Sequence, residues 1–153
     1  MVLWYEVDPT PLAPVLLRTG VIGNNAPDTF FFNAAISPDR RKDGATAKFG
    51  DSFVIQYNVS SSTINPGVAA ASSFRGGGLK SLTVRNGVAP YLDRTCKDPG
   101  SECSWGTDTS AVPDPRPTSV GRGAVWGTNQ YSGKRTPQPD AVNFRTWIFA
   151  LQP

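Results

Sequence analysis

The sequence predicts an all-β protein, and three observations support that prediction. Fourteen prolines and fifteen glycines are spread through the 153 residues, so they divide the chain into short segments and leave no room for a long helix. Many of these segments are apolar and of strand length. Two of them also recur after roughly 75 residues, as expected of an array of similar β units.

The repeat consists of two pairs of similar segments. Residues 33–39 (NAAISPD) resemble 109–114 (TSAVPD), and 54–58 (VIQYN) resemble 125–131 (VWGTNQY). Such self-similarity indicates a propeller or a solenoid, although two unrelated strands could share these common residues. About two units fit in the chain, and a propeller needs four or more blades to close. We therefore predict antiparallel four-stranded blades of a partial β-propeller, with a β-sandwich as the alternative.

The first two predicted strands, at residues 3–7 and 15–19, end at turn residues. Asp8-Pro9 follows the first strand, and Gly20 follows the second. Neither strand has an earlier partner in the chain, so residues 2–20 are predicted to be the outer strands of a preceding blade.

Residues 30–86 are predicted to form the first complete blade. The run at 30–37 is apolar without alternation, which is typical of an inner strand covered on both faces. Strands at 52–58, 67–74 and 79–85 follow. The three consecutive glycines at 76–78 favour a flexible hairpin over a phosphate-binding loop, because no helix follows them.

Residues 104–151 are predicted to form the second blade. Its strands are expected at 109–112, 124–131 and 144–151, joined by proline-rich connectors. The last strand, FRTWIFAL, is too apolar to remain uncovered, so we expect it to close a sheet. In the sandwich alternative it would pair with the strand at 3–7. The whole chain, 1–153, is treated as one module.

The two cysteines are predicted to form a disulfide. Cys96 and Cys103 enclose the turn signal Asp98-Pro99-Gly100, which would bring their Cβ atoms within bonding distance. Closing so short a loop stabilises by about 2–3 kcal/mol at most. A disulfide implies an oxidising compartment, and two free thiols are the alternative.

The absence of histidine removes several kinds of chemistry. A Ser-His-Asp triad and a four-ligand zinc site are both excluded. The carboxylates considered for glycosidase chemistry each lie beside turn residues, where an acid usually caps backbone amides. They are Glu6, Asp51, Glu102 and Asp108. We predict no catalytic residue and no cofactor.

Calcium is the one metal that the acidic residues could bind. Asp39, Asp43 and Gly44 form one candidate group, and Asp108 and Asp114 form another. Neither group has EF-hand spacing, and the alternative is that these side chains cap turns.

Aromatic and amide side chains cluster in the second predicted blade and suggest a sugar-binding platform. An alternative is that they pack between sheets. The candidates are Trp105, Trp126, Asn129, Gln130 and Tyr131.

The charge pattern and hydropathy argue against two classes of partner. The net charge is +3, but basic residues are scattered apart from 40–42 and 134–135, which argues against nucleic acid. No run of eighteen apolar residues occurs, so no membrane span is expected. The first residues lack the basic and apolar regions of a signal peptide.

Several segments stand in an order that resembles a known family. They are 4–8 (WYEVD), 32–39, 50–62, 105–115, 125–131 and 144–147 (FRTW). Together they resemble the last blades of secreted bacterial sialidase-like, Asp-box-type β-propellers. The resemblance implies an extracellular or cell-surface location, and a chain that begins after a signal peptide or inside a parent protein.

The same resemblance implies partners but not catalysis. Ser37-Pro38-Asp39 lacks the continuation of the family's Asp-box, and no segment matches its catalytic motifs. We therefore expect a non-catalytic binding or structural module that associates with copies of itself or with missing blades. The alternatives are a fragment of a sialidase-like glycoside hydrolase and a small carbohydrate-binding β-sandwich.

Overall fold

A computed structural model describes residues 1–23, 27–40, 51–93, 103–106, 108–116, 123–134 and 142–153. These residues form nine strands and no helix, which confirms the all-β prediction. The strands are β1 (Val2–Asp8), β2 (Val15–Ile22), β3 (Phe30–Pro38), β4 (Phe53–Ser60), β5 (Gly67–Ser73), β6 (Lys80–Arg85), β7 (Ser110–Pro113), β8 (Val125–Ser132) and β9 (Phe144–Leu151). The part of the chain that is described has no helix that could cross a membrane.

Every predicted strand has an observed counterpart, and the main difference is in β2. The sequence predicts a stop at Gly20, but β2 continues to Ile22. Gly20 lies opposite Trp4 on β1, and a Cβ there would be 2.5 Å from the Trp4 indole nitrogen. The glycine therefore makes room for the indole within the sheet instead of ending the strand.

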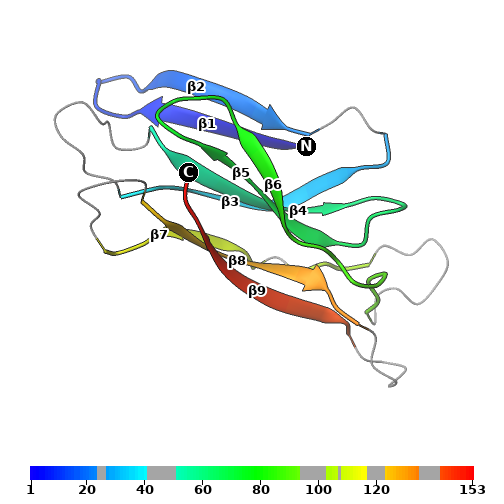
Figure 1. Cartoon of the computed structure of the whole chain (residues 1–153). Helices are drawn as coiled ribbons and strands as arrows, with labels where there is room; N and C mark the ends of the chain where they lie inside the picture. The colour runs from blue at the N-terminus through cyan, green and yellow to red at the C-terminus, as the bar shows by residue number, and fades with distance from the viewer. Residues whose placement is uncertain (24–26, 41–50, 94–102, 107, 117–122, 135–141) are drawn as a thin grey trace.

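The strands form three antiparallel sheets arranged in three layers (Figure 1). Their orders are β1-β2, β3-β4-β5-β6 and β7-β8-β9. Residues 30–86 contain the predicted four strands, whereas the described part of 104–151 contains three.

The middle sheet contributes to two hydrophobic cores, one on each face. Ile55 and Tyr57 on β4 pack with Val2 and Ile22 of the first sheet. Val54, which points the opposite way, packs with Val125 of the third sheet and with Ala70. Because β4 and β5 lie between two other sheets, their sequences are largely apolar, with little alternation between apolar and polar residues.

The prediction that residues 30–37 form a strand covered on both faces is wrong. β3 is an edge strand, with Phe30 61% and Ile36 47% exposed, and the strand covered on both faces is β4. The β3–β4 register shifts between Phe32 and Ala35, where Asn33 adopts a left-handed φ of 52°. This bulge changes which side chains face the core, and the apolar run alone does not reveal it.

The last strand, β9, closes its own sheet by pairing with β8 along its whole length. It does not pair with β1, whose described partner is β2. The pairing that would close a sandwich is therefore not formed, because the middle sheet lies between these two strands.

Two hairpins, β3–β4 and β7–β8, share the same register at their connecting ends. Pro38 lies opposite Phe53, and Pro113 lies opposite Val125. The aspartate that follows each proline donates its backbone N–H to the residue just before the next strand: Asp39 to Ser52 O at 3.0 Å and Asp114 to Ala124 O at 2.8 Å. The register aligns Phe53, instead of the expected Val54, with Val125.

Candidate functional site

Two buried carboxamides on β4 join the middle sheet to the third sheet. Gln56 and Asn58 are fully buried and lie on the same face of β4 as Val54. The Gln56 amide nitrogen lies 2.9 Å from Thr128 O and also contacts Ser110 O. The Asn58 amide nitrogen donates to Gln130 O at 2.7 Å.

The Gln130 carbonyl needs a side-chain donor because β7 is short. β7 pairs with β8 only as far as Thr128, so the following part of β8 has no strand on that side among the described residues. A buried carbonyl without a partner costs about as much as a lost hydrogen bond. The carboxamides of β4 therefore provide donors to the main chain of β8 where β7 ends.

Gly127 allows β4 to approach β8 this closely. A Cβ at this position would lie 2.5 Å from the Phe149 ring and 3.1 Å from the Gln56 side-chain oxygen. A larger residue would separate the carboxamide from the carbonyls that it binds.

Trp105 belongs to the same interface. Its indole N–H donates to the Asn58 side-chain oxygen at 3.1 Å, and its ring packs edge-on against Tyr91, with centroids 4.6 Å apart. Asn33 also donates to the Asn58 oxygen, at 3.3 Å. The Asn58 side chain thus accepts from Trp105 and Asn33 and donates to Gln130 O and to Gly67 O of its own sheet, so both of its polar atoms are hydrogen-bonded.

The five predicted platform residues do not form one surface. Alternation along β8 places Trp126 and Gln130 on the outward face and Asn129 and Tyr131 on the inward, buried face. Trp105 lies in the interface described above. Their residue types suggested a shared surface, but alternation in a strand separates neighbours in sequence.

The inward-facing members of this group contribute to packing. Asn129 is fully buried, and Tyr131 packs edge-on against Trp147 with centroids 6.2 Å apart. The Arg85 guanidinium from β6 lies 4.9 Å from the Tyr131 ring and 4.6 Å from the Trp147 ring. These contacts join the edge of the middle sheet to the third sheet.

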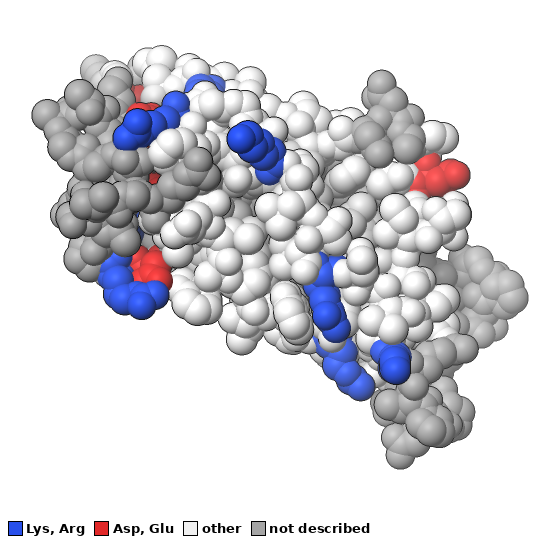
Figure 2. Space-filling view, in the orientation of Figure 1, with Lys and Arg blue, Asp and Glu red and all other residues white. Residues whose placement is uncertain are grey.

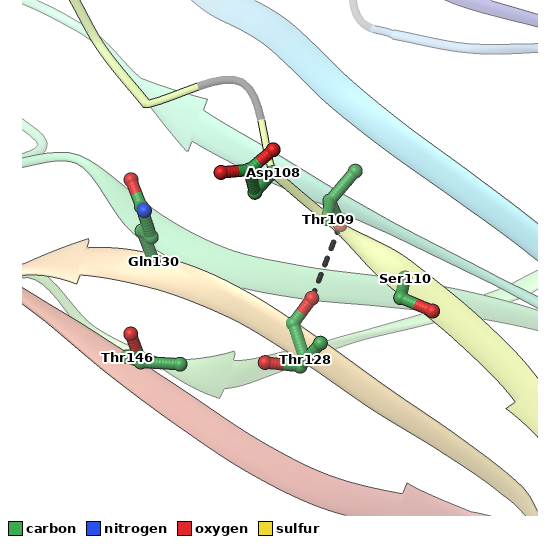
Figure 3. A pocket seen from close by; sticks show the side chains of 6 residues that line it. All are labelled: Asp108, Thr109, Ser110, Thr128, Gln130 and Thr146. Atoms are coloured by element: carbon green, nitrogen blue, oxygen red, sulfur yellow. Dashed lines mark hydrogen bonds between the residues drawn. The ribbon is translucent and has the colours of Figure 1, made fainter.

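A polar depression of about 370 Å³ lies on the outward face of the third sheet (Figure 3). Its lining consists of Asp108, Thr109, Ser110, Thr128, Gln130 and Thr146. Among these described residues, hydroxyls and a carboxamide surround one carboxylate, that of Asp108. Sequence reasoning missed the serine and threonines, which the cross-strand register brings together from β7, β8 and β9.

Gln130 is the member of this depression with an unsatisfied group. Its side-chain oxygen is buried and has no hydrogen-bond partner among the described residues. The side chain lies over Gly106, where a Cβ would be only 2.0 Å from that oxygen. The glycine thus allows Gln130 to lie flat beside the depression.

Asp114 and Trp126 lie at the other end of the same outward face. The Trp126 indole N–H donates to the Asp114 carboxylate at 3.1 Å, and Arg116 binds the carboxylate through two side-chain nitrogens at 2.8 and 3.1 Å. The hydrogen bonds from Arg116 hold the pKa of Asp114 well below its usual range.

The acidic candidates for catalysis lie apart. Glu6 forms an ion pair with Arg18 across the first sheet, and Asp108 lines the depression on the third. Asp51 precedes β4, and Glu102 lies outside the described residues. Among the described residues that line the depression, Asp108 is the one carboxylate, whereas a two-carboxylate glycosidase uses a pair.

The calcium and disulfide predictions involve residues outside the described part of the chain. Asp43, Gly44 and Cys96 all lie there, so the pairing of Cys96 with Cys103 stays a prediction. Within the described residues, no group of three His, Cys, Asp or Glu side chains is placed to hold a metal ion. Asp39 instead accepts a hydrogen bond from Gly123 N at 3.2 Å, and this contact joins the middle and third sheets.

Comparisons with protein-family models, curated proteins and solved structures found no match. The sialidase-like resemblance therefore stays an expectation drawn from the sequence.

Proposed function

We propose that this chain is a non-catalytic assembly module whose two outward sheet faces are covered by further β-sheets. Those sheets come from the rest of a larger extracellular protein or from copies of the same chain. One observation carries the proposal: β4 and β5 of the middle sheet are buried on both faces, whereas the two outer sheets expose apolar side chains on their outward faces.

The outward face of the first sheet is apolar along both strands. Val2 and Trp4 point to the core, so the intervening residues of β1 point outward. Tyr5 is 59% exposed, and the other exposed apolar residues on this sheet include Leu3, Val7, Leu17 and Val21. A sheet with one solvated face normally alternates between apolar and polar residues, and these strands do not.

The outward face of the third sheet mixes apolar and polar side chains. Val112 lies opposite Trp126, and Ile148 lies opposite Thr128. Ile148 is 69% and Trp126 40% exposed. Covering each large apolar side chain stabilises by up to about 1.5–3 kcal/mol, so both faces favour a binding partner.

Charge does not oppose such contacts. Figure 2 shows that Lys and Arg side chains are dispersed over the face in view and that much of its centre has no charged side chain. On the outward face of the third sheet, the Asp114 carboxylate is already paired with Arg116, so covering it does not bury an unpaired charge.

The sialidase-like resemblance supports an extracellular origin for the covering sheets. In such a propeller, each blade is covered by its neighbours, and two blades cannot close the ring. The stacking of three sheets here is compatible with that arrangement, and the shared register of β3–β4 and β7–β8 adds support.

The test combines light scattering across a concentration series with urea unfolding. We expect a mass that rises with concentration if copies cover the faces. A monomer without a cooperative transition would support covering by the rest of a larger protein. A monomer that unfolds cooperatively, with stability independent of concentration, would overturn the proposal, because both outward faces would then be stable in water.

Carbohydrate binding is the second candidate, favoured by the hydroxyl-lined depression beside the exposed Trp126 ring. Trp126 and Thr128 lie on the same face, about 7 Å apart along β8. An exposed indole can stack on a sugar ring while hydroxyls and a carboxamide bind its hydroxyl groups. Calorimetric titration with neutral oligosaccharides tests this candidate: binding that Thr128→Val weakens would support it, and no measurable heat with any sugar would contradict it.

A further inference from the structure

We infer that the outward face of the third sheet (β7–β9) is equivalent to the face of the middle sheet that packs against the third sheet. A second copy of this chain binds to that outward face through the outward face of its own first sheet (β1–β2). This inference rests on the proposed function and names its partner. The occupant follows from the direction in which each sheet faces the next.

The register makes the two faces equivalent. With Phe53 aligned to Val125, Gln56 corresponds to Thr128 and Asn58 corresponds to Gln130. On the middle sheet, Gln56 and Asn58 bind main-chain carbonyls of the next sheet. On the third sheet, Thr128 and Gln130 point outward into the depression.

A second pair of positions follows the same rule. Asp39 and Asp114 occupy equivalent places after β3 and β7. The Asp39 carboxylate accepts a hydrogen bond from Gly123 N, which precedes β8 of the next sheet. The Asp114 carboxylate lies at the corresponding edge of the outward face, where Arg116 and Trp126 bind it.

The depression lies where a neighbouring sheet would make contact. On the middle sheet, Gln56 binds the Thr109 hydroxyl at 3.0 Å and contacts Ser110 O, so a β7-like strand covers that position. The equivalent position on the third sheet is the depression, where the buried Gln130 oxygen has no described partner. A strand edge with main-chain donors and acceptors matches this polar lining.

The direction of stacking identifies which face of a second copy fits. On β4, the side of Ile55 faces the preceding sheet, and the side of Val54 faces the following sheet. In the first sheet, Val2 and Trp4 face the following sheet. The outward face of β1–β2 therefore corresponds to the side of β4 that faces the preceding sheet. In the described chain, no preceding sheet covers this face.

The first sheet also has the chemistry that the depression requires. It has two strands, so each has one edge without a strand partner among the described residues. Its exposed apolar row, which includes Tyr5, matches Val112, Trp126 and Ile148 on the other face. Because the two surfaces differ, copies join head to tail and form either a closed ring or a filament.

The test uses one lysine substitution on each face of the full chain. Ile148→Lys changes the third-sheet face, and Tyr5→Lys changes the first-sheet face. Each buries a charge in the contact, so we expect each to weaken association by roughly tenfold or more. Leu12→Lys, at a fully exposed loop position, is the matched control and should associate like the unmodified chain.

Mixing the two variants distinguishes head-to-tail contact from contact between identical faces. Each variant retains one unmodified face, so an equimolar mixture should form a dimer that does not grow further, although each variant alone is a monomer. Val21→Lys provides a second first-sheet variant if Tyr5→Lys fails to fold, which circular dichroism detects. Light scattering measures the mass in every case.

Different outcomes overturn the inference and the proposed function. If the unmodified chain associates but Ile148→Lys does not weaken it, or the mixture stays monomeric, the head-to-tail inference fails alone. A monomer without cooperative unfolding also overturns only the inference, since the covering sheets then belong to a larger protein. A cooperative monomer overturns both.

Discussion

At the scale of single residues, Asp114 shows how a charged side chain is held on the outward face. It accepts hydrogen bonds from Arg116 and from the Trp126 indole, and Arg116 is the main cause of its lowered pKa. A carboxylate with a lowered folded-state pKa stabilises the fold above its unfolded pKa of about 4, and this contribution is lost as the pH falls below that value.

Asp114→Asn should therefore reduce stability at neutral pH and matter less in acid. We expect the difference in free energy of unfolding between the unmodified chain and the variant to be constant above about pH 5 and to shrink below about pH 4. Urea unfolding at a series of pH values measures it. A difference that stays the same from neutral pH down to about pH 2 would contradict the ion pair.

Tyr91 should give a corresponding effect in alkali. Its hydroxyl lies 2.9 Å from the Asp93 carboxylate and 2.8 Å from Ser104 O. Burial, together with the hydrogen bond to Asp93 and its charge, raises the pKa of Tyr91 to about 12. The neutral phenol thus contributes stability that is present below about pH 10 and lost as the pH rises to about 12.

Tyr91→Phe should remove the tyrosine titration near pH 12 from the ultraviolet absorbance profile. Burial also raises the pKa of Tyr57, so this tyrosine also titrates at high pH. Tyr57→Phe is the control that separates its absorbance change from that of Tyr91. Loss of an absorbance change centred near pH 10 in Tyr91→Phe would show that the Asp93 contact does not form.

At the scale of elements, contact between sheets depends on a few buried polar side chains. Gln56→Met keeps the approximate length of the side chain but removes the side-chain donor to Ser110 O, whereas Thr128 O keeps the Thr109 hydroxyl as a donor. A buried acceptor without a donor costs about 1–3 kcal/mol, so we expect a loss of stability of that size.

Leu12→Met, at a fully exposed loop position, is the control and should change the free energy of unfolding by less than about 0.5 kcal/mol. Urea unfolding of the two variants makes the comparison. If Gln56→Met is as stable as the unmodified chain, then the carboxamide does not hold β4 to β8.

At the scale of the whole molecule, the two cores share the middle sheet. Ile55 and Val54 are neighbours on β4 and belong to opposite cores. Loss of one core therefore exposes the middle sheet and weakens the other, so we expect all three sheets to unfold in one transition.

Two variants, each of which retains a single tryptophan, test whether the two cores unfold together. Trp4 reports on the first sheet and Trp147 on the third. Their fluorescence transitions in urea should coincide with each other and with the loss of circular dichroism. Separate midpoints for the two probes would show that the outer sheets unfold independently.

Much of the strand pattern was predictable from the sequence. Prolines and glycines end the segments, and their local conformational limits act without help from distant residues. All nine strands and the four-stranded set at 30–86 were predicted for this reason. Gly20 was misread because its role is to make room for Trp4 on another strand.

The sequence alone thus determined where the chain extends and turns, because turn residues act locally. Tertiary structure decided that β4 lies at the centre, that Trp126 and Asn129 face opposite ways, and that Gln56 binds the main chain of Thr128, 72 residues away. Such a contact depends on the order and register in which sheets stack. Residue types do not specify that order by themselves, since the same glutamine could cap a turn or face water.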